Sequence, residues 1–416
     1  MAATLKLGTD KNWATKEGKL LGYNDENGNF KPIPFDVTSD ADATRVNKEG
    51  LIERTKTNVP RINFDGADNP YLLLEPTRTN LAPYSVDLDT LLSSGAPTIT
   101  DNETTAPDGS NTASKITQSN ANEYQSRFLN FYSGISGSTA YTRSIFAKAG
   151  EDSILFLQQY DGTNNYGTYF DLINGTKTDS NAAVTSKMES FGDGWYRCSV
   201  TYTTVSSATQ ERIQVAIAQS VGVPPAYQGD GTSGFYIWGA QIEAGTYPTS
   251  LIPTSGSAVT RTADDWENTD GVTVTGDFTF FVHIKNFENK TLGNYPLQLF
   301  LREASSPFNY FRFLLEANER FFAQLRDNNT STTVFNRSAS LLSDLGDDIK
   351  LAFAKSGTNC KYYENGSLIA SLTITDFNYS FNRINHSTGN DQPSKLSQLM
   401  VFDEALSDAE LISITS

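Results

Sequence analysis

Apolar residues recur at every second position along most of the chain, and this alternation constrains the fold more than any other feature. Ile213, Val215 and Ile217 alternate with polar or small residues, and the leucines within 297–301 follow the same rule. Successive side chains of a strand point to opposite faces, so a period of two buries one face of a sheet. No strand-helix rhythm of a parallel sheet is present. The sequence therefore predicts an all-β chain built from antiparallel sandwiches.

Short local motifs place the turns and one helix. Asp161–Gly162, Asn174–Gly175 and Asn365–Gly366 are pairs that favour tight hairpin turns. Ser407 and Glu410 have the spacing of a capping box, in which each side chain satisfies an amide donor at a helix start. We expect one short helix at the end of the chain.

Composition divides the chain into three regions. Residues 1–80 are polar and turn-rich, so they bury too little surface to fold alone and need the next domain, a sister chain or another partner. Regular strands run through 81–257, and a Pro-, Gly- and Ser-rich linker at 253–258 precedes a second strand series at 262–416. The predicted fold is an extended N-terminal anchoring segment followed by two antiparallel β-sandwich domains.

An excess of acidic residues restricts the partners. The 32 Lys and Arg residues against 48 Asp and Glu residues give a net charge of −16, which repels the phosphates of nucleic acid. No apolar stretch approaches the roughly 20 residues of a membrane-spanning helix, and residues 1–10 lack the apolar part of a secretory signal. We expect a soluble chain made in a cytoplasm, without nucleic-acid binding or membrane insertion.

The chain is poor in cysteine and histidine, which limits its chemistry. Cys198 and Cys360 lie in different predicted domains, which excludes a disulfide framework and a thiolate zinc site. Cys198 falls on the apolar side of an alternating segment and is predicted to be a buried, inert thiol. The two histidines are His283, which is expected on a strand surface, and His386. Catalysis by imidazole is therefore disfavoured.

Between residues 43 and 81, a segment we call the leader, several short phrases carry a resemblance. They are 43–47, 50–53, 58–62 and 72–81, the last containing Glu-Pro-Thr-Arg-Thr-Asn at 75–80. The leader resembles the N-terminal part of tailed-bacteriophage virion proteins that carry lectin-like sandwiches. In that family such a leader precedes a jelly roll like that of carbohydrate-binding modules. Here the jelly roll would include 141–150 and 192–197 and close at 235–243, followed by 247–254.

The third region resembles the concanavalin A-like lectin/laminin-G sandwich. Residues 362–368 match its Asn-Gly hairpin, and 399–410 match its last strand and terminal turn. The two resemblances imply a head fibre or tail-associated fibre on the virion surface, synthesised in the cytoplasm of a bacterial host. They also imply a homotrimer, with a dimer left open, that attaches to other virion proteins (capsid or tail) through residues 1–80.

One hairpin combines amides with tyrosines in the way sugar sites do. Aromatic rings stack on the apolar side of a sugar ring, and amides take its hydroxyl groups. The alternative is ordinary cross-strand pairing within a sheet. The candidate glycan-binding residues are Gln158, Tyr160, Asn164, Tyr166 and Tyr169.

Other aromatic and charged residues suit contacts between parts of the chain or between subunits. Trp195 and Trp238 are expected in a domain core or at its rim, whereas Trp266 stands among charges just after the linker. The candidate interface residues are Trp13, Arg45, Arg78 and Trp266.

Catalytic and metal motifs are missing from the sequence. It contains no Gly-x-Ser-x-Gly, His-Glu-x-x-His, Walker A or Glu-x-Asp-x-x-Glu string. The acids Asp101, Asp108, Glu243 and 264–265 lack EF-hand spacing and are expected on a solvated surface, with a structural calcium ion left open. We expect no catalytic residues and no cofactor.

Together these features predict a structural virion protein that binds host-surface glycan through many weak sites at once. Two alternatives stay open. A glycosidase needs only two carboxylates at a suitable separation, so a polysaccharide-degrading enzyme is compatible with this composition. A capsid decoration protein without sugar binding has the same core pattern.

Overall fold

The computed structural model describes most of the backbone, and its regular secondary structure is almost all β-strand. The described residues are 5–8, 14–15, 20–24, 30–38, 43–65, 69–92, 94–131, 134–274, 276–285, 298–303, 306–316, 320–327, 330–336, 348–373, 379–385 and 394–416. Side chains are described for 8, 43–65, 69–90, 92, 94–131, 134–264, 276–285, 326, 348–373 and 395–416.

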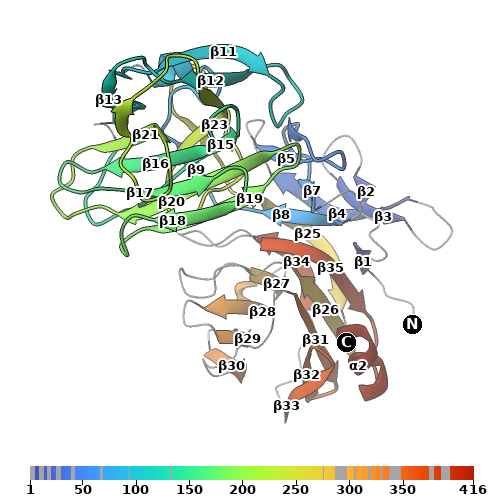
Figure 1. The fold of residues 1–416 in the computed structure, drawn as a ribbon. Coiled ribbons are helices and arrows are strands. Elements are labelled where there is room, and N and C mark those ends of the chain that lie inside the picture. The colour runs from blue at the N-terminus through green and yellow to red at the C-terminus, as the bar shows by residue number, and fades with distance from the viewer. Residues whose placement is uncertain are drawn as a thin grey trace.

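Two antiparallel sheets of six strands form a jelly-roll sandwich in the middle of the chain (Figure 1). The first jelly-roll sheet has the order β10 (Ser94–Gly95), β14 (Ser126–Phe131), β21 (Glu211–Ala218), β16 (Ile154–Tyr160), β17 (Asn165–Asp171) and β18 (Thr176–Asp179). The second jelly-roll sheet has the order β11 (Thr98–Thr104), β12 (Ala113–Thr117), β23 (Gly234–Ala244), β15 (Ala140–Lys148), β20 (Trp195–Thr203) and β19 (Thr185–Ser190).

The main hydrophobic core lies between these two sheets. Ile213, Val215 and Ile217 of β21 are fully buried in it together with Cys198 and Val200 of β20. The predicted alternation is thus confirmed in β21, because the odd-numbered residues of this strand face the core. The buried Cys198 thiol confirms its predicted position, and burial raises its pKa well above the usual value.

Short elements complete the jelly roll and the leader. A helix, α1 (Leu88–Leu91), precedes the first sheet. Three further pairs of strands lie outside the large sheets: β13 (Asn122–Tyr124) with β22 (Ala226–Gln228), β5 (Thr44–Val46) with β6 (Ile52–Arg54), and β9 (Arg78–Asn80) with β24 (Val259–Arg261).

The C-terminal region adds two larger antiparallel sheets. One has the order β33 (Ser367–Thr373), β32 (Asn359–Glu364), β31 (Ile349–Ser356), β26 (Phe278–Ile284), β35 (Ser394–Phe402), β8 (Pro70–Leu74) and β7 (Ile62–Phe64), with β1 (Leu5–Leu7) also on β35. The other has the order β2 (Ala14–Thr15), β3 (Leu20–Asn24), β4 (Phe30–Thr38), β25 (Asp265–Val274), β34 (Tyr379–Asn385), β27 (Gln298–Glu303), β28 (Ser306–Glu316), β29 (Arg320–Asp327) and β30 (Thr330–Asn336).

Strands from the N-terminal 80 residues therefore belong to sheets of the C-terminal region. β8 pairs with β35 so that Leu72 lies opposite Leu396, and β4 pairs with β25. Figure 1 shows the blue N-terminal strands beside the red and orange C-terminal strands. Of the three partners considered for residues 1–80, the same chain provides one. The C-terminal region pairs with their strands, and the adjacent jelly roll packs against Ile52 of the leader.

Two local predictions are confirmed at the end of the chain, and one segment is more fixed than expected. Asn365–Gly366 turns β32 into β33 with positive φ at both residues, and Ser407 caps the helix α2 (Asp408–Thr415) in a capping box with Glu410. The predicted linker is held by hydrogen bonds, among them one from the Thr254 hydroxyl to the Ala82 carbonyl (2.7 Å). In the described ranges no helix has the length and apolar character needed to cross a membrane.

Candidate functional site

The predicted glycan hairpin is formed by β16 and β17. Gln158 lies opposite Gly167, and Tyr160 lies opposite Asn165. Asp161 builds the turn between them: its Oδ1 accepts hydrogen bonds from the backbone N–H groups of Thr163 (2.9 Å) and Asn164 (2.7 Å). Its other oxygen accepts one from the Val205 N–H (3.0 Å), which attaches the turn to the second sheet. A carboxylate therefore sets the loop length and with it the register of the hairpin.

The five predicted residues divide between the two faces of the first jelly-roll sheet. Gln158, Tyr160 and Tyr169 lie on the outer face, which points away from the main core. Tyr166 instead packs against that core and makes an edge contact with Tyr202, with ring centroids 5.5 Å apart. Asn164, in the turn, donates a hydrogen bond to the Tyr202 hydroxyl (2.6 Å). The structure places three of the five residues on one face of the sheet and gives the other two contacts within the chain.

A second apolar cluster lies on this outer face. Phe156 and Tyr169 stack with ring centroids 4.0 Å apart and an angle of 13° between the rings. They pack with Ile154, Ala216 and Ala218, separately from the main core. All five residues are at most 9% exposed, so this cluster is a buried layer beneath the other side chains of the outer face.

Tyr124, which the sequence did not single out, lies across the same face from β13. Its hydroxyl donates a hydrogen bond to Gln158 Oε1 (2.8 Å), and the residue is 37% exposed. Burial of the hydroxyl raises the pKa of Tyr124 to about 12, so it remains a hydrogen-bond donor at neutral pH. The Gln158 side chain lies over Gly167, where a Cβ would come within 2.9 Å of its Cγ. No sequence pattern links Tyr124 to a strand 30 residues away, because their contact depends on the fold.

An arginine organises the polar side of the outer face. The Arg212 guanidinium lies over two rings, 4.3 Å from the centroid of Phe128 and 4.9 Å from that of Tyr160. Arg212 donates hydrogen bonds to Asn130 Oδ1 (2.7 Å) and Gln214 Oε1 (3.2 Å). Flat ring surfaces thus alternate with amides held in place, which is the chemistry that sugar recognition requires.

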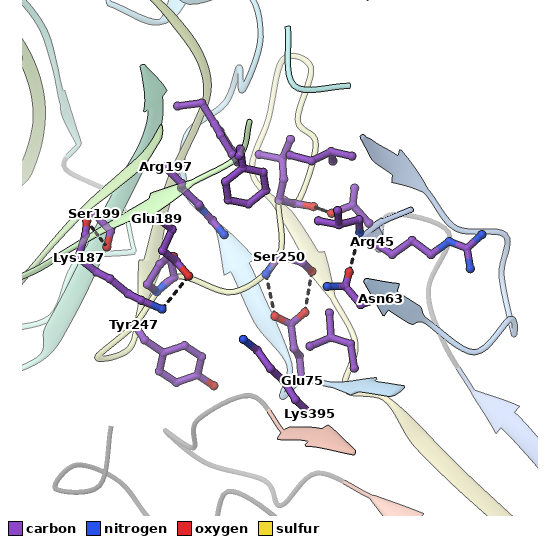
Figure 2. Close-up of a pocket in the computed structure, with 18 of the residues that line it drawn as sticks. Arg45, Asn63, Glu75, Lys187, Glu189, Arg197, Ser199, Tyr247, Ser250 and Lys395 are labelled. Atoms are coloured by element: carbon purple, nitrogen blue, oxygen red, sulfur yellow. Dashed lines mark hydrogen bonds and ion pairs between the residues drawn. The ribbon is translucent and has the colours of Figure 1, made fainter. Parts of the chain in front are cut away.

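The outer face of the second jelly-roll sheet is covered by the leader, and a pocket of about 450 Å³ lies between them. Arg197 and Ser199 of β20 and Lys187 and Glu189 of β19 line one side, and Figure 2 shows them opposite leader residues such as Asn63. A loop at 246–251 and Lys395 of β35 complete the wall. Three parts of the chain that are distant in sequence therefore meet at this pocket.

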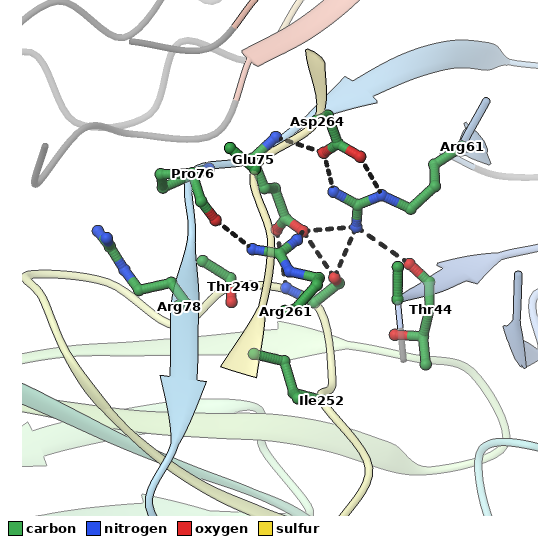
Figure 3. Close-up of polar contacts among 12 residues, drawn as sticks. Thr44, Arg61, Glu75, Pro76, Arg78, Thr249, Ile252, Arg261 and Asp264 are labelled. Carbon is green, nitrogen blue, oxygen red and sulfur yellow. Dashed lines mark hydrogen bonds and ion pairs between the residues drawn. The ribbon is translucent and has the colours of Figure 1, made fainter. Parts of the chain in front are cut away.

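A buried ionic network joins the leader to the segment after the jelly roll. Glu75 accepts hydrogen bonds from Arg61 Nη1 (2.6 Å), from the Ser250 hydroxyl (2.6 Å) and from Arg261. Arg61 also binds Asp264, as Figure 3 shows. The side chains of Arg61 and Arg261 are fully buried. The two arginines and the two carboxylates therefore lose their hydration on folding and are stabilised by one another instead.

The predicted interface residues have different positions. Arg45 pairs with Glu53 (2.6 Å) at the rim of the pocket. Arg78 is buried inside the chain with its guanidinium 5.4 Å from the centroid of the Tyr247 ring, so it joins the leader to the 246–251 loop. Trp266 lies in β25, where its backbone pairs with Val37, but its side chain is not described. Trp13 lies outside the described residues.

Two tryptophans and one histidine complete the comparison with the sequence. Trp195 and Trp238 are each 2% exposed and share a second core cluster, which confirms their expected place. His283 is more buried than predicted: its side chain is 12% exposed, with Nε2 3.6 Å from Asp348, and His386 is outside the described residues. Within the described part of the chain, no three His, Cys, Asp or Glu side chains gather as a metal site.

No protein-family model matches the sequence, and no curated protein matches it either. Solved structures do resemble about a third of the chain. They include the CBM40 module of Ruminococcus gnavus IT-sialidase (17% identity, 34% of this chain and 83% of that chain, TM-score 0.27). A leech intramolecular trans-sialidase (19% identity, 34% and 23%, TM-score 0.27) and the binding domain of botulinum neurotoxin serotype D (12% identity, 36% and 39%, TM-score 0.30) are also similar. The likeness concerns the β-sandwich fold, and no binding residue is carried over from it.

Proposed function

We propose that this chain is a glycan-binding protein without catalytic activity and that its sugar site is the outer face of the first jelly-roll sheet. The observation that carries the proposal is the exposed Tyr124 ring, which is hydrogen-bonded to Gln158 on a face that the main core does not use. Arg212, which lies over the Phe128 and Tyr160 rings, adds a fixed planar cation on the same face. Such a face binds one sugar weakly, and several copies acting together raise the avidity.

The test is a glycan array probed with the full chain, followed by titration of the best glycan. Tyr124→Ala and Tyr160→Ala remove rings from the outer face, and we expect each to weaken binding by about tenfold. Tyr236→Ala is the matched control, because Tyr236 is a partly buried tyrosine of β23 on the other sheet. Binding that survives both outer-face changes, or is lost in the control, contradicts the proposed site.

We further propose that the chain is displayed on a bacteriophage particle as a head or tail fibre, most simply as a homotrimer. The support is the sequence resemblance of the leader to virion proteins, centred on 75–80. Mass spectrometry of purified particles and a density map with three copies at one attachment point are the expected results. A chain absent from particles contradicts this role.

Two further measurements separate the alternatives. If the chain releases reducing ends from host capsule polysaccharide, it is a depolymerase, and the proposed absence of catalysis is wrong. If it gives no signal on the array while particles lacking it lose stability, it is a decoration protein. The reducing-end assay and the glycan array use the same purified chain, and the particle assay uses virions that lack it.

A further inference from the structure

The pocket between the leader and the second jelly-roll sheet has an unbalanced positive charge. Among its carboxylates, Glu75 is bound by two buried arginines, and Glu189 pairs with Lys187 at 2.7 Å. Arg45 is balanced by Glu53. Each of these lining charges therefore has an opposite charge beside it.

Two other cations of the pocket have no such partner. Arg197 and Lys395 make no ion pair with a carboxylate in the described part of the chain, and Lys395 Nζ instead lies 5.6 Å from the centroid of the Tyr71 ring. Figure 2 shows the Arg197 guanidinium and the Lys395 side chain entering the pocket from opposite sides. Glu189 attracts both cations from further away, and Glu243 also attracts Arg197. In a chain with a net charge of −16, a pocket with two cations that lack a directly paired carboxylate is a local exception.

Buried hydrogen-bond donors in the same wall also lack partners. Arg197 is 6% exposed, and its Nη2 donates to the Thr249 carbonyl (2.7 Å) and the Ser144 hydroxyl (3.1 Å). Its Nε has no partner among the described residues, and neither does the hydroxyl of Tyr247, which is 8% exposed. Leaving a buried donor unsatisfied costs about 1–3 kcal/mol, so a ligand that accepts from these groups is favoured.

The rest of the wall suits a small hydroxylated molecule. Hydroxyl side chains line the part formed by β19 and β20, and the Phe146 and Phe191 rings meet edge to face with centroids 4.9 Å apart. The volume of about 450 Å³ is within the range of small-molecule sites, which is about 300–1,000 Å³. The hydroxyl residues that line this part are Thr185, Ser186, Ser199 and Thr201.

We propose that this pocket binds the carboxylate of an acidic sugar, with Arg197 and Lys395 holding the negative charge and the hydroxyl side chains contacting the ring hydroxyls. The inference rests on the proposed glycan-binding function and adds a second site with its own ligand class. The two sites are separate, because the pocket lies on the second jelly-roll sheet and the aromatic stack on the first.

The experiment is a calorimetric or NMR titration of the full chain with D-glucuronate, D-glucose and acetate. Glucose has the same ring without the charge, and acetate has the charge without the ring. We expect glucuronate to bind at least about tenfold more tightly than either. Equal binding of glucose or acetate overturns the proposal, because the pocket would then recognise only a ring or only an anion.

Variants locate the site and separate it from the outer face. Lys395→Gln and Arg197→Lys should each weaken glucuronate binding by about tenfold or more, whereas Lys148→Gln, which removes a half-buried lysine paired with Asp193 outside the pocket lining, should not. Thermal melting confirms that each variant is folded; because Lys395 is only partly buried, its variant keeps the test valid if the Arg197 variant unfolds. Unchanged binding by Lys395→Gln overturns the proposal.

Tyr124→Ala distinguishes a failure of the pocket assignment from a failure of the proposed outer-face site. If it abolishes glucuronate binding while the pocket variants do not, the acidic sugar binds the outer face and the pocket assignment is wrong. If glucuronate binds the pocket but no glycan is affected by Tyr124→Ala, the proposed outer-face site is wrong and the pocket stands.

Discussion

Arg61 and Asp264 are 203 residues apart in sequence and form a buried, two-bonded ion pair. Arg61 Nε donates to Asp264 Oδ1 at 3.1 Å, and Nη2 donates to Oδ2. Asp264 also accepts the backbone N–H of Glu75 (2.8 Å), at the end of β8. One carboxylate thus attaches the leader to the start of the C-terminal region, both through a side chain and through the backbone.

Removing that carboxylate should be costly. Asp264→Ala leaves the Arg61 guanidinium buried with one of its two carboxylate partners, and breaking a buried pair in this way costs about 3–5 kcal/mol. Urea unfolding of the full chain measures the change. Asp193→Asn is the control: Asp193 is 82% exposed in its pair with Lys148, so its loss should cost at most about 1 kcal/mol. Equal stability of the two variants contradicts the proposed role of Asp264.

Glu75 should make the stability depend on acid pH. Burial alone raises the pKa of Glu75, but Arg261 and Arg61 outweigh burial and hold the pKa far below its usual value. The unfolded chain therefore takes up this proton at a higher pH than the folded chain does. The stabilisation is complete above the unfolded pKa of about 4.3 and is lost as the pH falls toward the folded pKa.

The measurement is the free energy of unfolding at several pH values for the natural chain and for Glu75→Gln. We expect the natural chain to lose stability more steeply between about pH 5 and pH 2. Other carboxylates contribute to both curves, so the difference isolates Glu75. Parallel curves would show that the two arginines do not favour the charged form of Glu75.

The sequence predicted the strands much better than their partners. Alternation identified the buried side of β21, since it depends only on neighbouring positions. It contains no information on which strands pair, and the partner of β8 is β35, more than 300 residues further along the chain. The low apolar content of residues 1–80 did predict that they need a partner, but it did not distinguish the next domain, a sister chain and another protein.

The candidate site was predicted in part for the same reason. The tyrosines and amides identified the hairpin, but Tyr166 and Tyr169 are three positions apart in one strand and must point to opposite faces. That much followed from the sequence. Tyr124 and Arg212 reach the site from other strands, and the pocket is formed by three distant segments, so only the folded chain reveals them.

A buried pair inside the jelly roll should behave differently from the Arg61 network. Arg143 and Glu211 are fully buried and joined by one contact of 3.2 Å, while Arg143 Nε and Glu211 Oε1 have no partner among the described residues. Burial raises the pKa of Glu211 even though Arg143 opposes that rise. Desolvation is therefore poorly compensated at this pair.

We expect Glu211→Leu alone to destabilise the chain by about 3–5 kcal/mol, because it leaves Arg143 buried and unpaired. Adding Arg143→Met should restore the stability or exceed that of the natural chain by about 1–4 kcal/mol. Thermal and urea unfolding of the single and double variants provide the comparison. A double variant as unstable as the single one would mean that the pair stabilises the sandwich more than apolar packing can.

The pairing of β8 with β35 predicts which fragments of the chain fold. Leu72 and Leu74 of β8 are fully buried, and Leu72 lies opposite Leu396 of β35. A fragment of residues 262–416 lacks β1, β7 and β8, so one edge of β35 loses its partners and buried apolar surface is exposed. We expect this fragment to aggregate, whereas 78–261, which keeps both jelly-roll sheets and the β9–β24 pair, should unfold cooperatively.

Adding the missing strands back completes this test. Coexpression of residues 1–81 with 262–416 should recover soluble protein, because the leader supplies the strand that covers the β35 edge. Solubility, circular dichroism and thermal unfolding measure the recovery, and Leu72→Asp in residues 1–81 is the control that should prevent it, since a charge would enter a fully buried position. A 262–416 fragment that is soluble and cooperative by itself would mean that the N-terminal strands are attached to a sheet that is stable without them.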